Sequence, residues 1–342
     1  MKTIQKQKIG VINGKEVSRF TLDNGYIKFS ALNYGCVITE INTPNRYGAF
    51  ENVVLGFGDD LEKYQTDSPY FGSIVGRCAG RISKSSFELG GKTYVLPANE
   101  RHNHLHGGPL GFSEVVWNGD VIDEAIVFTY HSKAMEMGYP GNVDVTVSYR
   151  LIKNELIAEY EATVDERTPI NMTNHSYFNL SGNAKETVHN HKLTVPSKRV
   201  LELNKESLPT GEFIDVDGTV FDLQAGRYLN EAFESTEEQI QIVEQGFDHP
   251  FELEEGLIRL EDEKSGRILT IETSQPAVVV YTGNQLVEGQ FEVNGCPVKR
   301  YHGVCLETQG LPDAVNHEEF PSCIVVPEKS YFSKTTYRFD TM

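Results

Sequence analysis

The segment VDVTVSYRLIKNELIAEYEA, residues 143–162, carries the clearest secondary-structure signal of the chain. Apolar and polar residues alternate along its first half, a period of two that is typical of a strand with one buried face. The apolar members are Val143, Val145, Val147, Tyr149 and Leu151. Lys153-Asn154 is expected to turn the chain, because the alternation resumes at Leu156 and continues to Ala162. The segment therefore predicts two successive β-strands.

Turn signals between alternating segments recur through the rest of the chain. Asn24-Gly25 predicts a hairpin over residues 17–32, because Asn-Gly between alternating runs is the strongest short-range hairpin signal. Gly90-Gly91 predicts a second hairpin over residues 86–96. Further strands are predicted at residues 125–130, 192–195, 268–272, 277–281, 303–307, 323–326 and 331–339.

Helical signals are few. A short helix is expected at residues 59–65 and a longer one at 229–244, where Phe233, Ile240 and Val243 are spaced by seven and three residues. Strands do not alternate with helices, so neither a Rossmann fold nor a TIM barrel is expected. We expect an all-β fold, a large antiparallel β-sandwich with few short helices, in a single domain over residues 1–342. Such sheets pack in two layers, and a curved sheet leaves a concave face for a ligand.

The chain is acidic. Its 49 Asp and Glu outnumber its 31 Lys and Arg, which gives a formal net charge of -18. Nucleic acids and anionic membranes require clustered positive charge, so neither is an expected partner. The same charge disfavours a multiply phosphorylated substrate, unless a local basic pocket overrides it.

The cysteines and the N-terminal residues indicate a cellular compartment. The five cysteines are odd in number, scattered and never in a C-x-x-C pair, so they predict neither a zinc site nor a disulfide framework. They are Cys36, Cys78, Cys296, Cys305 and Cys323. The start MKTIQKQKIG lacks the apolar stretch of a signal peptide, and no apolar run is long enough to span a membrane. These features predict a cytoplasmic protein.

Residues 168–182, TPINMTNHSYFNLSG, place a histidine among aromatic and amide side chains. An imidazole in such surroundings can be held in one orientation and have its pKa tuned, as a general acid or base requires. His175, beside Tyr177 and between Asn174 and Asn179, is therefore a candidate catalytic residue. The alternative is a core histidine with satisfied hydrogen bonds.

Residues 70–83, YFGSIVGRCAGRIS, contain three glycines at intervals of four: Gly72, Gly76 and Gly80. Because glycine is unfavourable inside a helix, we expect close backbone packing that presents Arg77 and Arg81 to a pocket. The alternative is a surface turn in which the two arginines form salt bridges.

Residues 99–108, NERHNHLHGG, contain the alternating histidines His102, His104 and His106. In a strand, this alternation would place all three on one face, and histidine is the commonest metal ligand. A zinc site would need further Cys, His or carboxylate ligands at short spacing, which the segment lacks. We therefore favour a loop that lets a substrate approach closely, and keep a metal site as the alternative.

Two carboxylates complete the set of candidates. Asp248 lies in GFDHPF, residues 246–251, where it could equally be a turn former. Glu307 ends a short apolar strand before a loop with Gly310 and Pro312. A carboxylate at this place could be a base that faces a pocket, and the alternative is that it is simply the first exposed residue after the strand. The chain has no G-x-S-x-G elbow. The candidates together suit metal-free acid–base chemistry on a polar, uncharged ligand such as a sugar ring.

A series of segments resembles the aldose 1-epimerases, the galactose mutarotases, in the family's order and over nearly the whole chain. They are GRCAGRI (76–82), NHLHGG (103–108), GYPG (138–141), NHSYFNLSG (174–182), PTG (209–211), GT and FD (218–222), GFDH (246–249), SGR (265–267), YTGN (281–284) and LETQGLPDAVN (306–316). The resemblance implies a large β-supersandwich, in agreement with the strand pattern. It also implies an enzyme without metal or cofactor, whose partner is a free aldose and which is a monomer or homodimer.

The family's functional residues are carried over only where this sequence matches its motifs. Glu307 of LETQ would be the general base and His175 of NHSYFNL the general acid. The substrate-binding positions that the resemblance implies are Arg81, His106, Asp248, Asn103 and Tyr177. Arg101 departs from the pattern, which has a small residue there, and this change could alter the rim of the pocket.

The resemblance implies a mutarotation mechanism. Glu307 would take the proton of the C1 hydroxyl while His175 protonates the ring oxygen, so that the ring opens, rotates about C1–C2 and closes on the other face. Three alternatives remain: a glycoside hydrolase or lyase with Asp248 and Glu307 as a carboxylate pair, a hexose-6-phosphate epimerase, and a non-catalytic sugar-binding protein. The second would need extra basic residues near the pocket, and the third needs no acid–base pair.

Overall fold

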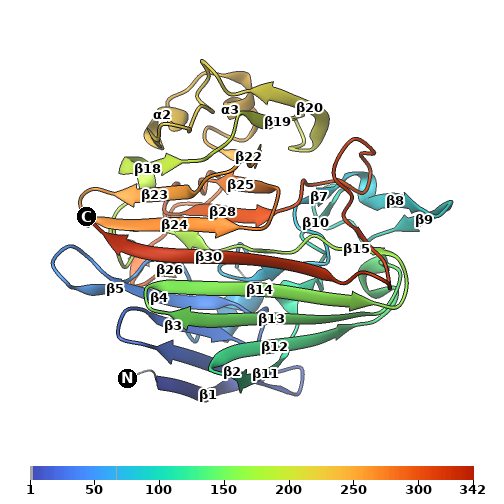
Figure 1. The fold of residues 1–342 in the computed structure, drawn as a ribbon, viewed down its shortest axis with the longest axis horizontal. Helices are drawn as coiled ribbons and strands as arrows, with labels where there is room; N and C mark the ends of the chain where they lie inside the picture. The colour runs from blue at the N-terminus through green and yellow to red at the C-terminus, as the bar shows by residue number, and fades with distance from the viewer. Residues whose placement is uncertain (1–2, 67) are drawn as a thin grey trace.

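The computed structural model describes residues 3–66 and 68–342, and most of its regular structure is β-strand (Figure 1). The largest sheet has nine strands, in the order β11 (Asn118–Ile122), β12 (Ala125–Ser132), β13 (Val143–Ile152), β14 (Glu155–Val164), β30 (Tyr331–Thr341), β24 (Arg267–Thr273), β23 (Ile258–Asp262), β18 (His191–Thr194) and β21 (Arg227–Tyr228). Its neighbouring strands are all antiparallel.

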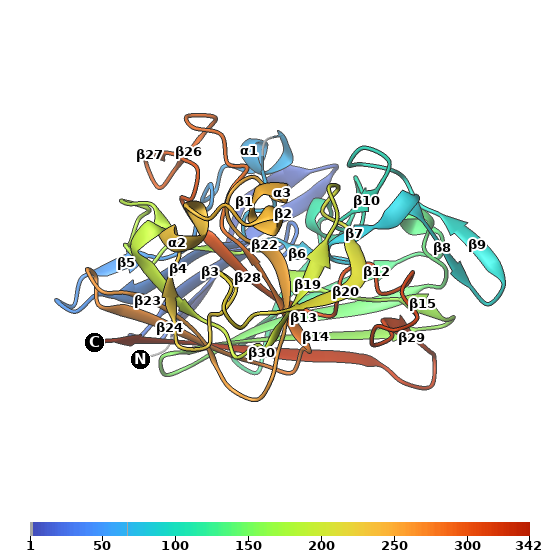
Figure 2. The same cartoon turned by 90° about the horizontal axis from the view of Figure 1, so that it is seen from above.

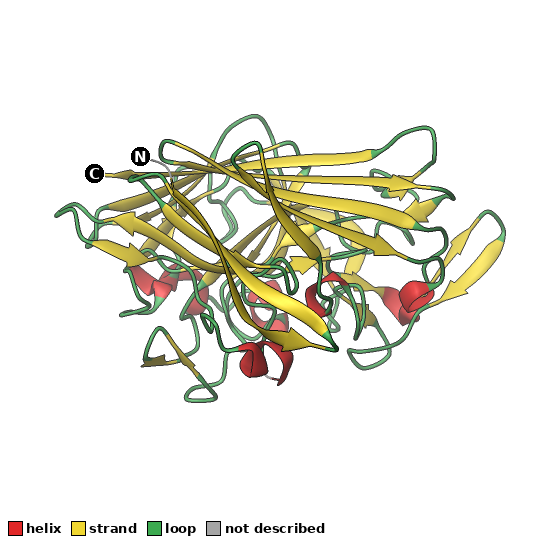
Figure 3. Cartoon of the chain, turned by 90° about the horizontal axis from the view of Figure 1, so that it is seen from below, coloured by secondary structure: helices red, strands yellow, loops and turns green. Residues whose placement is uncertain are grey.

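Two further sheets form the opposite layer. A six-stranded sheet has the order β17 (Tyr177–Phe178), β28 (Val304–Gln309), β25 (Ala277–Tyr281), β22 (Asp248–Glu252), β19 (Arg199–Leu203) and β20 (Pro209–Asp215). A five-stranded sheet contains β1 (Thr3–Ile12), β2 (Lys15–Asp23), β3 (Lys28–Leu32), β4 (Ile38–Pro44) and β5 (Phe50–Asn52). The views of Figures 2 and 3 show both sheets on one side of the nine-stranded sheet, with the short helices beyond them. The predicted all-β sandwich is confirmed.

Short two-stranded ladders complete the fold. They pair β6 (Ile74–Val75) with β16 (Thr173–Asn174), β7 (Arg81–Ile82) with β10 (His104–Leu105), β8 (Ser86–Leu89) with β9 (Lys92–Val95), β15 (Thr168–Pro169) with β29 (Ile324–Val325), and β26 (Glu292–Val293) with β27 (Cys296–Pro297). The β8–β9 ladder confirms the hairpin predicted around Gly90-Gly91.

The segment 143–162 forms β13 and β14, as its alternation predicts. The two strands pair over their full length, with Val147 opposite Tyr160, and their apolar face belongs to the main core between the two layers. The hairpin predicted at 17–32 is also present as β2 and β3. Its turn is held by Asn24, whose side-chain oxygen accepts hydrogen bonds from the backbone N–H of Tyr26 and Ile27.

The long helix predicted at 229–244 is wrong. The structure has two short helices there, α2 (Asn230–Phe233) and α3 (Glu238–Ile242). Polar side chains hold the break: Ser235 accepts a hydrogen bond from the N–H of Glu237, and the Glu237 carboxylate accepts one from Val220 of another segment. Local side-chain bonds of this kind compete with helix formation.

The short helix predicted at 59–65 is present as α1 (Leu61–Thr66). Within the two described ranges, no helix has both the length and the apolar character needed to cross a membrane.

Candidate active site

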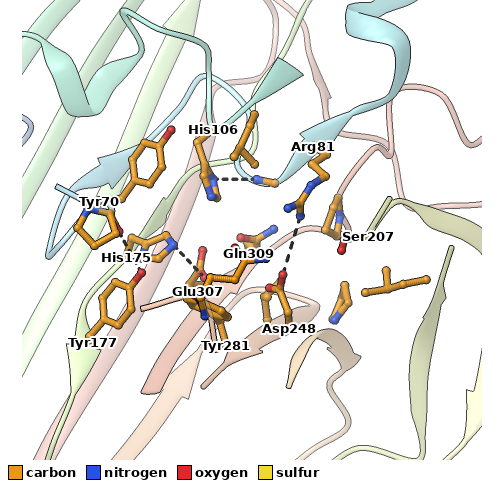
Figure 4. Close-up of a pocket in the computed structure, with 18 of the residues that line it drawn as sticks. Tyr70, Arg81, His106, His175, Tyr177, Ser207, Asp248, Tyr281, Glu307 and Gln309 are labelled. Carbon is orange, nitrogen blue, oxygen red and sulfur yellow. Dashed lines mark hydrogen bonds and ion pairs between the residues drawn. The ribbon is translucent and has the colours of Figure 1, made fainter. Parts of the chain in front are cut away.

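A cavity of about 250 Å³ lies on the face of the six-stranded sheet that points away from the main core (Figure 4). Segments far apart in the sequence form its wall: residues 69–70, 80–81, 105–106, 175–177, 203–209, 248–250, 279–286 and 307–312 contribute to it. The volume is small for a ligand pocket and suits a compact ligand such as a monosaccharide.

Strand β28 forms the floor of this cavity. Successive side chains of a strand point to opposite faces, and here Val304 and Leu306 belong to the core while Glu307 and Gln309 line the cavity. The period of two in LETQ thus places a carboxylate and an amide side by side. Gln309 was not among the predicted residues, although its spacing of two from Glu307 is enough to indicate it.

Glu307 is almost completely buried, with an exposed fraction of 3%. Burial raises the pKa of Glu307 well above that of an ordinary carboxyl group, and the nearby charge of Asp248 raises it further, whereas Arg81 lowers it. A carboxyl group in this environment binds a proton readily, which is what a general base must do during a reaction.

His175 lies between β16 and β17, and its backbone fixes its position. Its N–H donates to the carbonyl of Ser73, and its carbonyl accepts from the N–H of Gly72. The ring Nε2 lies 3.5 Å from Glu307 Oε1, and Nδ1 lies 3.6 Å from the Sγ of Cys305. Burial lowers the pKa of His175 to about 4.

The two groups therefore compete for one proton. Burial opposes the charged form of each, which favours neutral His175 with protonated Glu307. The imidazolium and the carboxylate attract one another across 3.5 Å in a poorly solvated site, which favours the ion pair. The pair thus has two neutral-overall states that differ only in where the proton lies.

His106 is held as a neutral hydrogen-bond donor. Its Nδ1 lies 3.2 Å from the backbone nitrogen of Gly80, whose N–H can only donate, so the ring proton resides on Nε2. Burial lowers the pKa of His106 well below the ordinary value, and the charges of His175 and Arg81 lower it further. The cavity wall includes His106, as predicted for a substrate-binding residue, and its role there remains a proposal.

Arg81 and Asp248 face one another at the other end of the cavity (Figure 4). Arg81 Nη1 lies 4.0 Å from Asp248 Oδ2. Asp248 is the first residue of β22, where it lies opposite Tyr281 of the neighbouring strand β25. Burial raises the pKa of Asp248, and the charge of Arg81 counteracts this shift. The site thus offers donors from Arg81 and His106 and an acceptor from Asp248, a combination that suits sugar hydroxyls.

Aromatic rings surround the histidines. The rings of Tyr70 and His106 lie 4.7 Å apart between centroids, and those of Tyr177 and His175 lie 5.1 Å apart. Tyr177, a predicted substrate-binding residue, lines the cavity while its hydroxyl donates to the carbonyl of Pro69. Tyr70 and Tyr281 also line the cavity and were not among the predicted residues.

Asn103, also predicted to bind substrate, lies outside the cavity wall. Its side chain is fully buried, accepts a hydrogen bond from the N–H of Lys84 and donates to the carboxylate of Glu206. This position supports a role in holding two neighbouring loops together rather than a direct sugar contact.

The three alternating histidines do not share a face, as the alternative of a continuous strand would require. Only His104 and Leu105 are in a strand, and His106 has a positive φ of 52°. His102 is exposed and pairs with Glu206, whereas His104 is buried with its Nδ1 2.7 Å from the carbonyl of Pro97. The shared face of the strand alternative is absent because the backbone turns between these positions.

The two arginines of GRCAGRI also separate. Arg81 lines the cavity, but Arg77 is buried elsewhere and donates to Ser132, to Thr168 and to the carbonyls of Lys133 and Pro140. The expectation that both arginines face a pocket is therefore wrong for Arg77, and neither lies in a simple surface turn.

Among the residues the structure describes, His175, Cys305 and Glu307 form a cluster whose ligand atoms lie within 4.8 Å of one another. Cys305 contacts Nδ1 of the imidazole and Glu307 contacts Nε2, so the two flank opposite nitrogens of the ring. Burial also raises the pKa of the Cys305 thiol, whereas a metal ligand must be the thiolate. The cluster therefore suits proton transfer better than metal binding.

A buried acid–base pair on the floor of a small cavity, surrounded by hydroxyl-binding side chains and aromatic rings, defines an enzyme that moves protons on a compact polyhydroxy ligand. The chain belongs to the aldose 1-epimerase family, whose sequence model matches residues 18–338.

Known relatives are similar in sequence to this chain over nearly its full length. The galactose mutarotase of Mus musculus is 38% identical over 331 residues, which cover 95% of each chain, and that of Homo sapiens is 38% identical over 335 residues with the same coverage. The crystal structure of galactose 1-epimerase from Lactobacillus acidophilus NCFM superposes with a TM-score of 0.88 at 27% identity, over 100% of this chain and 99% of that one.

Proposed function

We propose that this protein is an aldose 1-epimerase, or mutarotase, that interconverts the α and β anomers of free aldohexoses such as D-galactose and D-glucose. The observation that carries the proposal is the buried His175–Glu307 pair, with Nε2 and Oε1 3.5 Å apart beside the cavity. The identity of 38% to galactose mutarotases supports the same activity here.

Ring opening requires one proton to leave the C1 hydroxyl and another to reach the ring oxygen. These two oxygens are bonded to the same carbon, so their partners must also lie side by side, as His175 and Glu307 do. In the proposed reaction, Glu307 takes the hydroxyl proton while His175 donates its proton to the ring oxygen. The C1–O5 bond breaks, and a C1 aldehyde forms.

The open chain then rotates about C1–C2, and the ring oxygen attacks the other face of the aldehyde. Glu307 returns its proton to the new C1 hydroxyl, and His175 recovers its proton from the ring oxygen. The opening step converts an imidazolium–carboxylate pair into a neutral pair, the form that burial favours. No net proton, electron or bond is consumed over the cycle.

The remaining wall residues would hold the sugar while it reacts. His106 offers an Nε2 donor near the acid–base pair, and Arg81 with Asp248 offers a donor and an acceptor at the far end. We assign these three residues to sugar oxygens, with Tyr177 supporting the His175 ring. Correct placement of this kind contributes to the rate by making proton transfer effectively intramolecular.

Polarimetry of freshly dissolved α-D-galactose and α-D-glucose tests the proposal. The protein should accelerate relaxation to the same final rotation that the sugar reaches alone. Glu307→Gln and His175→Asn should each lower kcat by about 10²- to 10⁴-fold, since each removes one proton-transfer partner.

Two exposed substitutions control for charge and side-chain loss. Glu161→Gln on β14 and His131→Asn on β12 should keep the wild-type rate, because both side chains point to solvent. Circular dichroism should show all four variants folded. A folded Glu307→Gln or His175→Asn variant with wild-type turnover would refute the assigned role of that residue.

A further inference from the structure

Glu100 lies behind Arg81, outside the cavity wall, and binds the guanidinium through two atoms. Arg81 Nε lies 2.9 Å from Glu100 Oε2, and Arg81 Nη2 lies 2.8 Å from Oε1. The Arg81 side chain is 14% exposed and that of Glu100 is 29% exposed, so this ion pair is much less solvated than a surface pair. A bidentate pair of this kind is strong and directional.

The backbone places Glu100 at this position. Arg81 and Leu105 are partners in the β7–β10 ladder, which brings the two segments together. Between them the chain reverses at Arg101, whose φ is 55°, and Glu100 and Asn103 exchange backbone hydrogen bonds of 3.2 and 2.9 Å. Arg101, the residue that departs from the family's pattern, therefore lies in the turn that carries Glu100 and not in the cavity wall.

This contact leaves one end of the guanidinium for the cavity. Glu100 occupies the edge formed by Nε and Nη2, while Nη1 points toward Asp248. Arginine binds a phosphate through the same kind of two-atom edge. Of the described residues that line the cavity, Arg81 is the one Arg or Lys, and Asp248 and Glu307 are acidic.

We propose that Glu100 is a positioning and specificity residue: it aims Arg81 Nη1 at a sugar hydroxyl and, by occupying the bidentate edge and neutralising its charge, restricts the cavity to unphosphorylated aldoses. This inference rests on the proposed function. A phosphoryl group carries up to two negative charges, and here it would meet two carboxyl groups and an arginine that is already paired.

The test compares Glu100→Gln with wild type on D-galactose and on D-galactose 6-phosphate, with anomer exchange followed by two-dimensional NMR exchange spectroscopy. Glutamine keeps the size of the side chain but removes its charge and one acceptor. We expect KM for galactose to rise about tenfold, the effect of one lost charge-assisted hydrogen bond, with kcat within about twofold. The kcat/KM of galactose 6-phosphate relative to galactose should rise about tenfold or more.

Two further variants separate charge from position. Glu100→Asp retains the charge on a shorter side chain, so it should raise KM for galactose while still discriminating against the phosphate. Glu88→Gln removes an exposed carboxylate from the nearby strand β8 and should change neither quantity. An unchanged KM and an unchanged preference in Glu100→Gln would overturn the proposal, as would efficient turnover of galactose 6-phosphate by wild type.

Failure of the proposed function would give a different result. Wild type would then not accelerate galactose exchange at all. In that case, the binding of inorganic phosphate, measured by ³¹P NMR titration, still tests the inference: Glu100→Gln should bind phosphate more tightly than wild type, and equal affinities would overturn it.

Discussion

The chemistry of the site at the residue scale depends on the position of one proton. His175 and Glu307 are both buried, and neither is stable as an isolated charge. Together they hold one proton in either of two arrangements, and the proposed ring opening converts one arrangement into the other by way of the sugar. The same pair can therefore catalyse both directions of the reaction.

This sharing of one proton predicts a plateau of kcat/KM that begins above the pKa of His175, about 4, and ends at the raised pKa of Glu307. As the pH falls through about 4, His175 takes up a proton while Glu307 is already protonated, so the base is lost and the rate falls. As the pH rises, Glu307 releases the shared proton well above the ordinary carboxyl pKa, so the acid is lost and the rate falls again. The profile is measured by polarimetry after subtraction of the spontaneous rate at each pH.

The variants locate the two limbs of this profile. The residual activity of Glu307→Gln should lack the acidic limb, since the base is already gone, and should fall as the pH rises through the pKa of His175. An acidic limb near about pH 6.5 in wild type, the ordinary histidine value, would contradict the burial argument for His175.

The glycine-rich segment 76–82 shows at the element scale how two identical side chains take different tasks. Arg77 and Arg81 are four residues apart in GRCAGRI. Arg77 turns into the protein and donates to main-chain carbonyls and hydroxyls, while Arg81 turns into the cavity. One holds the segment against β12 and the other is proposed to hold the substrate.

Arginine-to-lysine substitutions should separate these tasks. Arg77→Lys cannot satisfy the acceptors that the guanidinium bonds, so it should lower the free energy of unfolding by about 3 kcal/mol, with little change in KM. Arg81→Lys should raise KM at nearly unchanged stability. Urea unfolding and galactose kinetics of both variants provide the comparison, and a stable Arg77→Lys with raised KM would reverse the assignment.

Sequence periodicity predicted many of the strands but not all, and it missed β4 and β23 although each alternates between buried and partly exposed residues. β13, β14 and β25 were found because apolar residues recur at one face or fill the strand. β1 was missed because it is an edge strand with mostly exposed side chains. β22 was missed because it contains Pro250, a residue that is unfavourable inside a sheet. The sheet accommodates this proline because β22 pairs with β19 at a single position.

The site could be predicted only in part. His175, Glu307, Arg81, His106 and Asp248 do line one cavity. Local residue patterns marked them as candidates, whereas their individual roles came from the resemblance to a family. Glu100 could not be found, because its contact with Arg81 depends on a turn with a positive φ at Arg101. Asn103 matched a motif and yet lies outside the cavity wall, where it bonds Lys84 and Glu206, since a motif does not record which partners a side chain finds.

Strand β30 contacts both layers of the molecule, the nine-stranded sheet and the six-stranded sheet. β30 lies between β14 and β24 in the nine-stranded sheet. The hydroxyls of Thr335 in β30 and Thr308 in β28, the residue that follows Glu307, lie 2.7 Å apart. The ring of Tyr337 packs near that of Phe178, the residue that ends β17. The floor of the cavity is thus supported by β30, which favours our proposal that residues 1–342 fold as one domain.

Deletion of residues 331–342 should therefore abolish folding of the whole chain, including the site. The deletion removes two long ladders at once and exposes the facing edges of β14 and β24 to pairing with other molecules. Removal of β1 is the matched control, because among the described strands that edge strand pairs only with β2. The shortened chain should unfold at a lower urea concentration but keep its mutarotase rate. Expression in soluble form, circular dichroism and polarimetry measure the outcome. A chain without β30 that still unfolds cooperatively and accelerates mutarotation would show that the six-stranded sheet folds independently, and the single-domain proposal would then be wrong.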